Sequence, residues 1–159
     1  MPYRERVAWP AWCHLFVAIP VVIAIVGGVE FVRREGWDWL TLLPFVAIAL
    51  LPAFWWRIRY IHLEAGADGV AFGFTGPRRR VARARILSAT VEEYSPSRYM
   101  GWGYRIGWKS GDRAYSVPGP GRGVRFEFTD EEGTPWSIFV SSYDPETVVR
   151  SLGLGAPKP

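Results

Sequence analysis

The sequence predicts a membrane-spanning helical hairpin followed by a mainly-β domain that ends in a short helix. Two long runs near the amino terminus, residues 7–29 and 39–56, contain no Asp, Glu, Lys or Arg. After residue 57, apolar and polar residues alternate in short segments separated by turns that contain glycine and proline, which is typical of β-strands. Near the carboxyl end the spacing of apolar residues becomes helical.

The first uncharged run has 23 residues and the second has 18. As helices these runs are about 34 Å and 27 Å long, close to the thickness of a hydrocarbon core. Tryptophans mark the run ends, as expected for residues that prefer the membrane–water interface. The flanking tryptophans are Trp9, Trp12, Trp37, Trp39, Trp55 and Trp56. A cleaved signal peptide is the alternative for the first run, but its apolar region is longer than the 7–15 residues such peptides use.

Arginines near the run ends predict the orientation. Arg4 and Arg6 precede the first run and Arg57 and Arg59 follow the second, whereas the connection carries only Arg33 and Arg34. Because basic flanks stay on the cytoplasmic side, we expect a multi-pass protein of the cell (plasma) membrane with both termini in the cytoplasm.

Two features inside the hairpin leave alternatives open. His14 is an ionisable residue within the first run and is therefore a candidate functional group, or else a neutral side chain bonded near the interface. The pair Gly27 and Gly28 permits close contact with another helix, or else it loosens the end of the first helix before Glu30. We favour the neutral histidine and the loosened helix end. Kinks are expected near Pro20 and Pro44.

The β domain is expected to hold about seven antiparallel strands. In residues 124–129, Val124, Phe126 and Phe128 should face inward and Arg125 outward. Asp144 should cap the terminal helix, which Gly153 ends. The predicted strands are residues 58–64, 70–74, 86–94, 104–108, 113–117, 124–129 and 135–140, with a hairpin turn at 109–112. The expected organisation is therefore an amino-terminal tail with two spans in residues 1–62, a β domain in 63–154, and a flexible tail in 155–159.

Four segments of the β domain, residues 101–107, 113–117, 122–128 and 141–148, are similar to the carboxyl half of bacterial pleckstrin-homology-like domains in small two-helix membrane proteins. The opening residues 3–7, with Pro10 and Trp12, also resemble small actinobacterial membrane proteins of uncharacterised function. The resemblance implies a partly open pleckstrin-homology-like barrel with a carboxyl-terminal helix. Because these families have no agreed activity, it implies no catalytic residue.

The residues offer no recognisable catalytic or cofactor chemistry. The single cysteine, Cys13, excludes an intramolecular disulfide and a cysteine-based zinc site. The spacing of Gly101, Gly103 and Gly107 misses the dinucleotide fingerprint, so these glycines are expected in hairpins and bulges. His62 follows the second span directly, away from any acidic cluster. We therefore expect a protein that is not an enzyme and that has no metal or cofactor.

The densest charge is basic and follows the membrane segment. If residues 78–85 form a strand, Arg79, Arg83 and Arg85 share one face, which either contacts anionic lipid headgroups or is a solvated strand. The candidate lipid contacts are Arg78, Arg79, Arg80, Arg83 and Arg85. Nucleic acid is not expected, since residues 63–159 carry 13 basic and 11 acidic residues, a net charge of only +2.

These features predict a membrane-anchored binding or scaffold module at the cytoplasmic face. Its partners would be the lipid bilayer with its anionic headgroups, and either an unknown protein or another copy of itself. Trp102 and Tyr104 are the candidate partner surface. The alternative is a structural or assembly protein that oligomerises through its helix hairpin.

Overall fold

The computed structural model describes residues 2–76, 78–107 and 111–153. The chain divides into two compact units, one formed by residues 10–58 and the other by residues 1–9 together with 59–159. The first unit is helical and the second is mainly β. The helical unit therefore interrupts the β unit in sequence, so that both ends of the chain belong to the β unit.

The helical unit contains two helices long and apolar enough to cross a membrane, Ala11–Glu35 and Trp39–Ile58. The first is the 3-10 turn η1 (Ala11–His14) followed by α1 (Leu15–Glu35), and the second is α2 (Trp39–Ala49) followed by α3 (Leu51–Ile58). The second helix is interrupted at Leu50, two residues before Pro52. A proline removes a backbone donor and crowds the preceding turn, which accounts for the interruption there. The side chain of Asp38 accepts hydrogen bonds from the amides of Leu40 and Thr41 and so caps α2.

The predicted end of the first span is corrected by the structure. Helix α1 continues through Gly27 and Gly28 to Glu35, six residues beyond the predicted end at residue 29. The ring of Phe45 on α2 lies against both glycines, and a Cβ atom added at Gly27 would be only 3.2 Å from this ring. The glycine pair thus lets α1 and α2 approach closely and does not loosen the helix end, which was the alternative favoured from the sequence.

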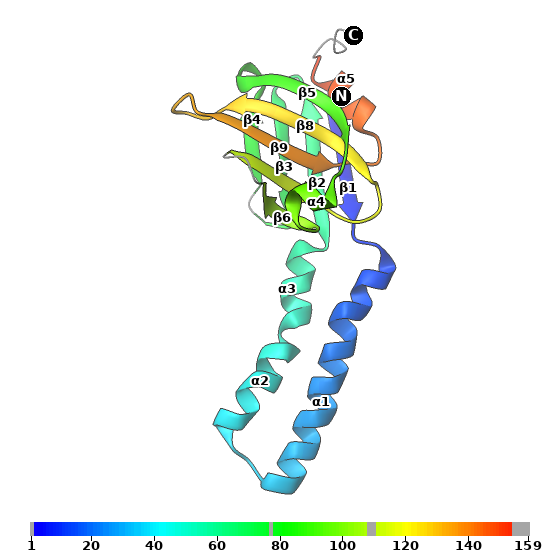
Figure 1. Cartoon of the computed structure of the whole chain (residues 1–159), viewed down its shortest axis with the longest axis vertical. Helices are drawn as coiled ribbons and strands as arrows, with labels where there is room; N and C mark the ends of the chain where they lie inside the picture. The colour runs from blue at the N-terminus through cyan, green and yellow to red at the C-terminus, as the bar shows by residue number, and fades with distance from the viewer. Residues whose placement is uncertain (1, 77, 108–110, 154–159) are drawn as a thin grey trace. The chain divides into compact units, whose positions relative to one another are not determined.

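The β unit contains two sheets (Figure 1). Sheet A has the order β1-β2-β3-β4 and sheet B the order β5-β8-β9-β7-β6. The strands of sheet A are β1 (Tyr3–Ala8), β2 (Tyr60–Gly66), β3 (Gly69–Phe74) and β4 (Arg79–Ala82). Those of sheet B are β5 (Ile86–Glu93), β6 (Gly103–Ile106), β7 (Asp112–Ser116), β8 (Arg122–Thr129) and β9 (Pro135–Ser141).

The amino terminus is a strand and not a tail, which corrects the predicted domain boundary at residue 62. Strand β1 pairs antiparallel with β2 from Tyr3 opposite Ala65 to Ala8 opposite Tyr60. The carboxylate of Glu5 also accepts hydrogen bonds from the Ser142 hydroxyl at 2.6 Å and the Tyr143 amide at 2.7 Å. Residues from both ends of the chain therefore complete the β domain.

Sheet B differs in one respect from the predicted antiparallel arrangement. Strands β7 and β9 are parallel, with Asp112 opposite Ser137 and Tyr115 opposite Val140. One edge of β9 is taken by β8, so the β6–β7 hairpin adds to the other edge of β9. The short strand β4 lies within residues 78–85, which the sequence offered as a strand only conditionally. The predicted turn at 109–112 and the tail at 155–159 lie wholly or largely outside the described residues.

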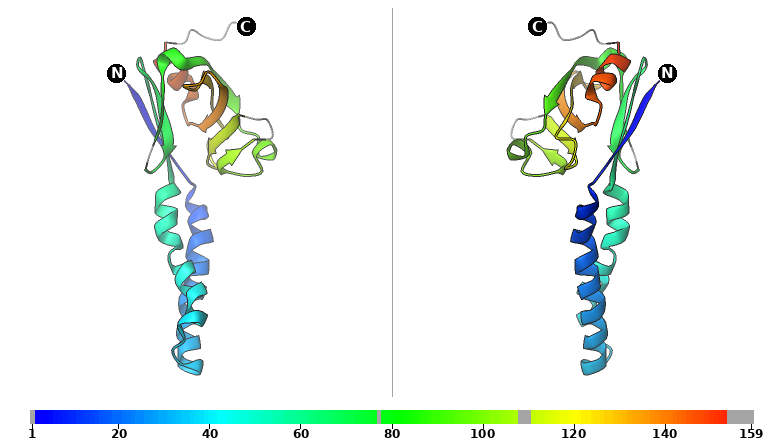
Figure 2. Two further views of the ribbon diagram at one scale, coloured as in Figure 1. Left: turned by 90° about the vertical axis from the view of Figure 1, so that its left-hand side faces the viewer. Right: turned by 90° about the vertical axis from the view of Figure 1, so that its right-hand side faces the viewer.

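The main core lies between the two sheets, and the predicted inward face of β8 is confirmed. Val124, Phe126 and Phe128 are at most 2% exposed and belong to this core. Helix α5 (Pro145–Ser151) contacts β1, β2, β5 and β8 and closes one end of the core. As predicted, Asp144 caps it by accepting a hydrogen bond from the Thr147 amide. Figure 2 shows α5 and the α4–β6 segment toward opposite ends of the β unit.

Candidate functional site

The predicted arginine strand is only half a strand. Strand β4 ends at Ala82, and residues Arg83–Arg85 form the 3-10 turn η2, so the arginines after Ala82 do not continue the face of Arg79. The Arg79 guanidinium lies over the rings of Phe128 at 5.1 Å and Trp136 at 4.8 Å. Stacking on aromatic rings fixes this side chain to the β domain itself.

The two arginines of η2 also have partners within the domain. Arg83 donates from Nε to the Leu152 carbonyl at 2.8 Å and so holds the end of α5. Arg85 lies 3.4 Å from the Glu131 carboxylate, an exposed pair worth at most about 1 kcal/mol. Three of the five predicted lipid contacts, Arg79, Arg83 and Arg85, therefore interact with other residues of the β domain.

The outer face of sheet A brings together four arginines that the sequence argument had not combined. In antiparallel register, directly opposite residues share a face. One row of this face runs across the sheet from Arg4 on β1 through Glu64 on β2 and Ala71 on β3 to Arg80 on β4. The next row on the same face contains Arg6 on β1, His62 on β2 and Gly73 on β3. The guanidinium of Arg78 reaches this face and lies 2.6 Å from Glu64. We call Arg4, Arg6, Arg78 and Arg80 the arginine face.

The arginine face is basic. The carboxylate of Glu64 lies 2.6 Å from the guanidinium of Arg78 and 3.8 Å from that of Arg4, and the positions of this face on β3 are the small residues Ala71 and Gly73. His62 lies on the same face and is 9% exposed, with its Nε2 atom 3.4 Å from the Thr75 hydroxyl. Burial lowers the pKa of His62, and the positive charges of Arg78 and Arg6 lower it further. The face can therefore offer several guanidinium donors to an anion.

Trp102 and Tyr104, the predicted partner surface, lie on or beside the edge strand of sheet B. Tyr104 belongs to β6 and is 44% exposed, and Trp102 precedes this strand and is 38% exposed. The ring of Tyr104 packs against that of Tyr115 with their centroids 4.9 Å apart. The preceding short helix α4 (Pro96–Tyr99) joins β5 to this edge. The two predicted residues are thus neighbours, and both are partly open to solvent.

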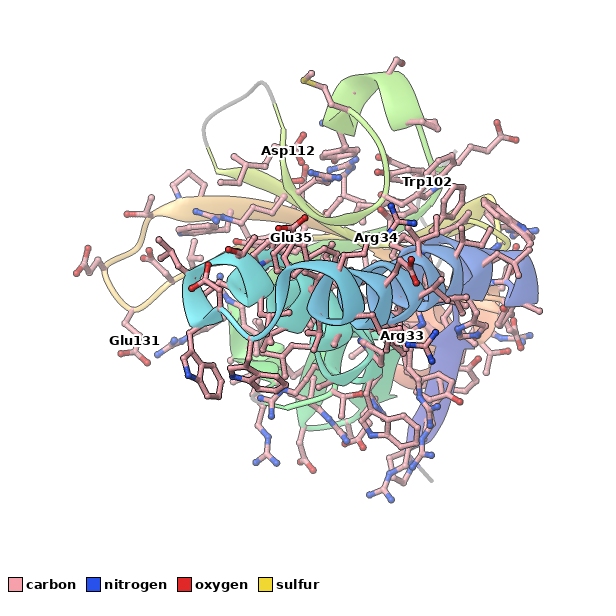
Figure 3. The ribbon with its side chains drawn as sticks, turned by 90° about the horizontal axis from the view of Figure 1, so that it is seen from below. Arg33, Arg34, Glu35, Trp102, Asp112 and Glu131 are labelled. Carbon is pink, nitrogen blue, oxygen red and sulfur yellow. The ribbon has the colours of Figure 1, made fainter. Side chains whose placement is uncertain are left out.

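A buried polar cluster, which the sequence argument missed, holds α4 against sheet B. Arg125 is 6% exposed, and its guanidinium donates to Asp112 at 2.9 Å, Glu92 at 2.7 Å and the hydroxyl of Tyr99 at 3.0 Å. Asp112 also accepts from Arg98 at 2.9 Å and from the Tyr99 hydroxyl at 2.9 Å. Figure 3 shows Asp112 on the same side of the β unit as Trp102.

The cluster lies on the side of sheet B that faces away from the main core. Arg125 does point away from the main core as predicted, but α4 covers it, so it is buried instead of exposed. Burial alone would lower the pKa of Arg125, but the hydrogen bonds to Tyr99 and Glu92 raise it above its ordinary value. A permanently charged guanidinium with its donors used by carboxylates and hydroxyls is a structural clasp and leaves little capacity for acid–base chemistry.

The remaining candidates for chemistry have local partners. The Nδ1 atom of His14 accepts a hydrogen bond from Trp55 Nε1 at 2.8 Å, so this histidine links the two helices of the hairpin. The backbone at Gly101 and Gly103 has positive φ angles of 110° and 105°, which suits the turns predicted there. Among the described residues, no group of three or more His, Cys, Asp or Glu side chains could hold a metal ion.

Comparison of the chain with known proteins finds no relative. No protein-family model matches it, and neither the curated proteins nor the solved structures contain a significant match.

Proposed function

We propose that the protein is a membrane-anchored, non-enzymatic binding module that presents a pleckstrin-homology-like β domain at the cytoplasmic face of the plasma membrane. The observation that carries this proposal is the pairing of β1 with β2. These strands are the segments immediately before and after the apolar helices, and they form one continuous antiparallel ladder. A two-sheet β domain closed at one end by a helix supports the likeness in architecture, although its parallel pair β7–β9 departs from a simple antiparallel barrel.

The β1–β2 ladder also supports the proposed topology. Two paired strands must lie on the same side of a membrane, so the chain between them crosses an even number of times. Two helices of sufficient length lie between them. The flanks of this hairpin carry Arg6 and Arg59 close to the helix ends, and the greater number of flanking arginines favours a cytoplasmic β domain.

The ligand that suits the arginine face is an anionic lipid headgroup. Four guanidinium groups against one carboxylate leave an excess of positive charge, and each basic residue near an anionic membrane surface contributes about 1 kcal/mol. Arg80 is an exposed member of this face. This proposal keeps Arg78 and Arg80 from the predicted lipid contacts and replaces Arg79, Arg83 and Arg85 with Arg4 and Arg6.

The test is retention of lipid by the intact chain. A fragment of residues 63–159 would lack β1 and the start of β2, so the full chain is purified from micelles that contain equal amounts of phosphatidylglycerol and phosphatidylcholine. Mass spectrometry then measures the ratio of the two retained lipids. Arg80→Gln should lower the preference for the anionic lipid about fivefold, which corresponds to one headgroup contact. Arg150→Gln is the matched control, since Arg150 is exposed on α5. Equal ratios for both variants would contradict the assignment.

The assembly alternative has less support from the geometry. Its natural contact surface was the small-residue pair Gly27 and Gly28, but within the hairpin the ring of Phe45 already covers this pair. Close approach of a second copy at these glycines would require Phe45 to move. The pair therefore serves the hairpin itself and carries no argument for oligomers.

A further inference from the structure

The β unit has one closed end and one open edge. Helix α5 covers the core at one end, whereas no element within the described ranges covers the opposite edge, where β6 is the last strand of sheet B. Large apolar side chains are exposed there, with 73% of Met100 and 65% of Ile106 accessible to solvent. We define the apolar rim as Met100, Trp102, Tyr104 and Ile106. Exposed apolar side chains that are grouped in this way mark an interaction surface.

Ring contacts place the apolar rim beside the end of sheet A at which the chain leaves for the helices. Tyr104 packs on Tyr115 with ring centroids 4.9 Å apart, and Tyr115 packs on Phe74 at 5.7 Å. Phe74 lies directly opposite Ile61, the second residue of β2. The other edge of sheet B is β5, which begins beside the far turn of sheet A, where the Arg83 amide donates to the Asp68 carbonyl. Figure 2 shows α4 and β6 level with the lower ends of β1 and β2.

Connectivity keeps this end of the β unit close to the membrane. Strand β1 ends at Ala8, and the first apolar helix begins at Ala11. The second apolar helix ends at Ile58, and β2 begins at Tyr60. Only Trp9 and Pro10 join β1 to the first apolar helix, and only Arg59 joins the second apolar helix to β2. Any weak affinity of the apolar rim for the bilayer therefore acts at a high effective concentration.

The composition of the apolar rim suits a lipid interface. Tryptophan and tyrosine prefer the headgroup level of a bilayer, and the apolar side chains of methionine and isoleucine can be buried at its acyl boundary. Arg105 lies within the rim segment and donates from Nε to the Trp102 carbonyl at 2.9 Å, and its exposed position suits contact with phosphate groups.

The backbone holds one rim residue in an unusual conformation. Met100 has φ 54° and ψ 47° and is the only non-glycine with positive φ in the described part of the chain. A left-handed methionine stores strain, and such strain persists where the position of the side chain matters. Here it occurs at the most exposed of the four rim side chains.

We propose that the apolar rim inserts into the interface of the same bilayer that the hairpin spans, so that the β domain is held by a third contact in addition to its two chain connections. This inference rests on the proposed membrane anchor and does not depend on the arginine face. It goes beyond anchoring because it fixes which edge of the β domain faces the lipid and leaves α5 directed away from it.

The test places an environment-sensitive fluorophore on single cysteines of the full chain in lipid nanodiscs. In a Cys13→Ala background, Ile106→Cys and Leu87→Cys are labelled separately with nitrobenzoxadiazole. Leu87 is the matched control because it is 62% exposed, compared with 65% for Ile106, and lies on β5 at the opposite edge of sheet B. Ile23→Cys on α1 is a third site, which reports insertion of the hairpin. Circular dichroism verifies that each variant is folded.

The label at residue 106 should shift its emission to the blue and lose intensity when nitroxide lipid with a shallow quencher is included, whereas the label at 87 should do neither. Equal water exposure at 87 and 106, with quenching at 23, would overturn the apolar rim and leave the anchor in place. Shielding at 106 without quenching would assign this edge to a protein strand or a second copy and would also overturn the proposal. Because residue 23 is at the middle of the first apolar helix, its label is read with a nitroxide placed deep in the acyl chain, and no quenching there would refute the proposed membrane anchor itself.

Discussion

Replacement of Asp112 by alanine should cost the β domain a large part of its stability. Asp112 is 3% exposed and accepts hydrogen bonds from Arg98, Tyr99 and Arg125, the last of which is itself 6% exposed. Removing one partner of a buried ion pair costs about 3–5 kcal/mol, because the remaining charge stays buried. A domain of this size is stable by about 5–15 kcal/mol. The loss should therefore be a substantial fraction of the total.

The assay is equilibrium urea denaturation of the full chain in detergent, followed by the near-ultraviolet circular dichroism of its aromatic residues. With a denaturant slope of about 2 kcal/mol per molar urea, Asp112→Ala should lower the midpoint by about 2 M. Hydrogen exchange should also become faster in α4, which the buried cluster holds against sheet B. Glu131→Ala is the control, since the Glu131 side chain is 85% exposed and its pair with Arg85 contributes at most about 1 kcal/mol. A midpoint for Asp112→Ala equal to that of the control would refute the clasp.

Three further predictions concern the β unit. Gly123→Ala should lower its unfolding free energy by more than about 1 kcal/mol in the same assay, because a Cβ atom there would overlap the Val140 carbonyl oxygen; wild-type stability would contradict this packing. Asp144→Ala should cost about 1 kcal/mol by removing the cap of α5, and Asp144→Asn should restore most of it; equal loss in both would point to charge and not to capping. Burial raises the pKa of Tyr3 to about 12 from its ordinary value of 10.0, so the contribution of its neutral form is complete below pH 10 and is lost as the pH rises toward 12; Tyr3→Phe should flatten this alkaline decline, and an unchanged slope would exclude Tyr3 as its source.

Local patterns were sufficient to predict the parts of the fold that depend on local interactions. The absence of charge in residues 7–29 and 39–56 identified both apolar helices, and alternation identified the buried face of β8. Asp144 followed by proline identified the start of α5. Each of these features is decided within a few residues, either by the period of burial or by a capping side chain.

The parts that the sequence did not predict depend on pairing between distant segments. Residues 3–8 alternate, but only the partner strand β2, more than fifty positions later, makes them a strand. The arginine face could not be predicted without that pairing, because Arg4 on β1 and Arg80 on β4 share a face only through the register of β2 and β3 between them. The buried cluster around Arg125 was missed for the same reason, since a charged residue on an alternating strand reads as exposed until another segment covers it.

The β1–β2 ladder pairs the segments on either side of the helical unit, so the stability of the hairpin and that of sheet A should be coupled. Closing a chain loop of about fifty residues to bring β1 against β2 costs conformational entropy. We expect the contacts within the helical hairpin, including Phe45 against Gly27 and Gly28, to lower this cost by holding the ends of that loop near each other. A side chain larger than alanine at Gly28 should therefore weaken sheet A, although it changes no residue of that sheet. Hydrogen exchange of the β1 amides in Gly28→Leu is the direct measure of this coupling. Faster exchange in β1 with unchanged exchange in β8 and β9 would show that the hairpin contributes to closing the β domain, whereas unchanged exchange throughout would show that sheet A forms independently of it.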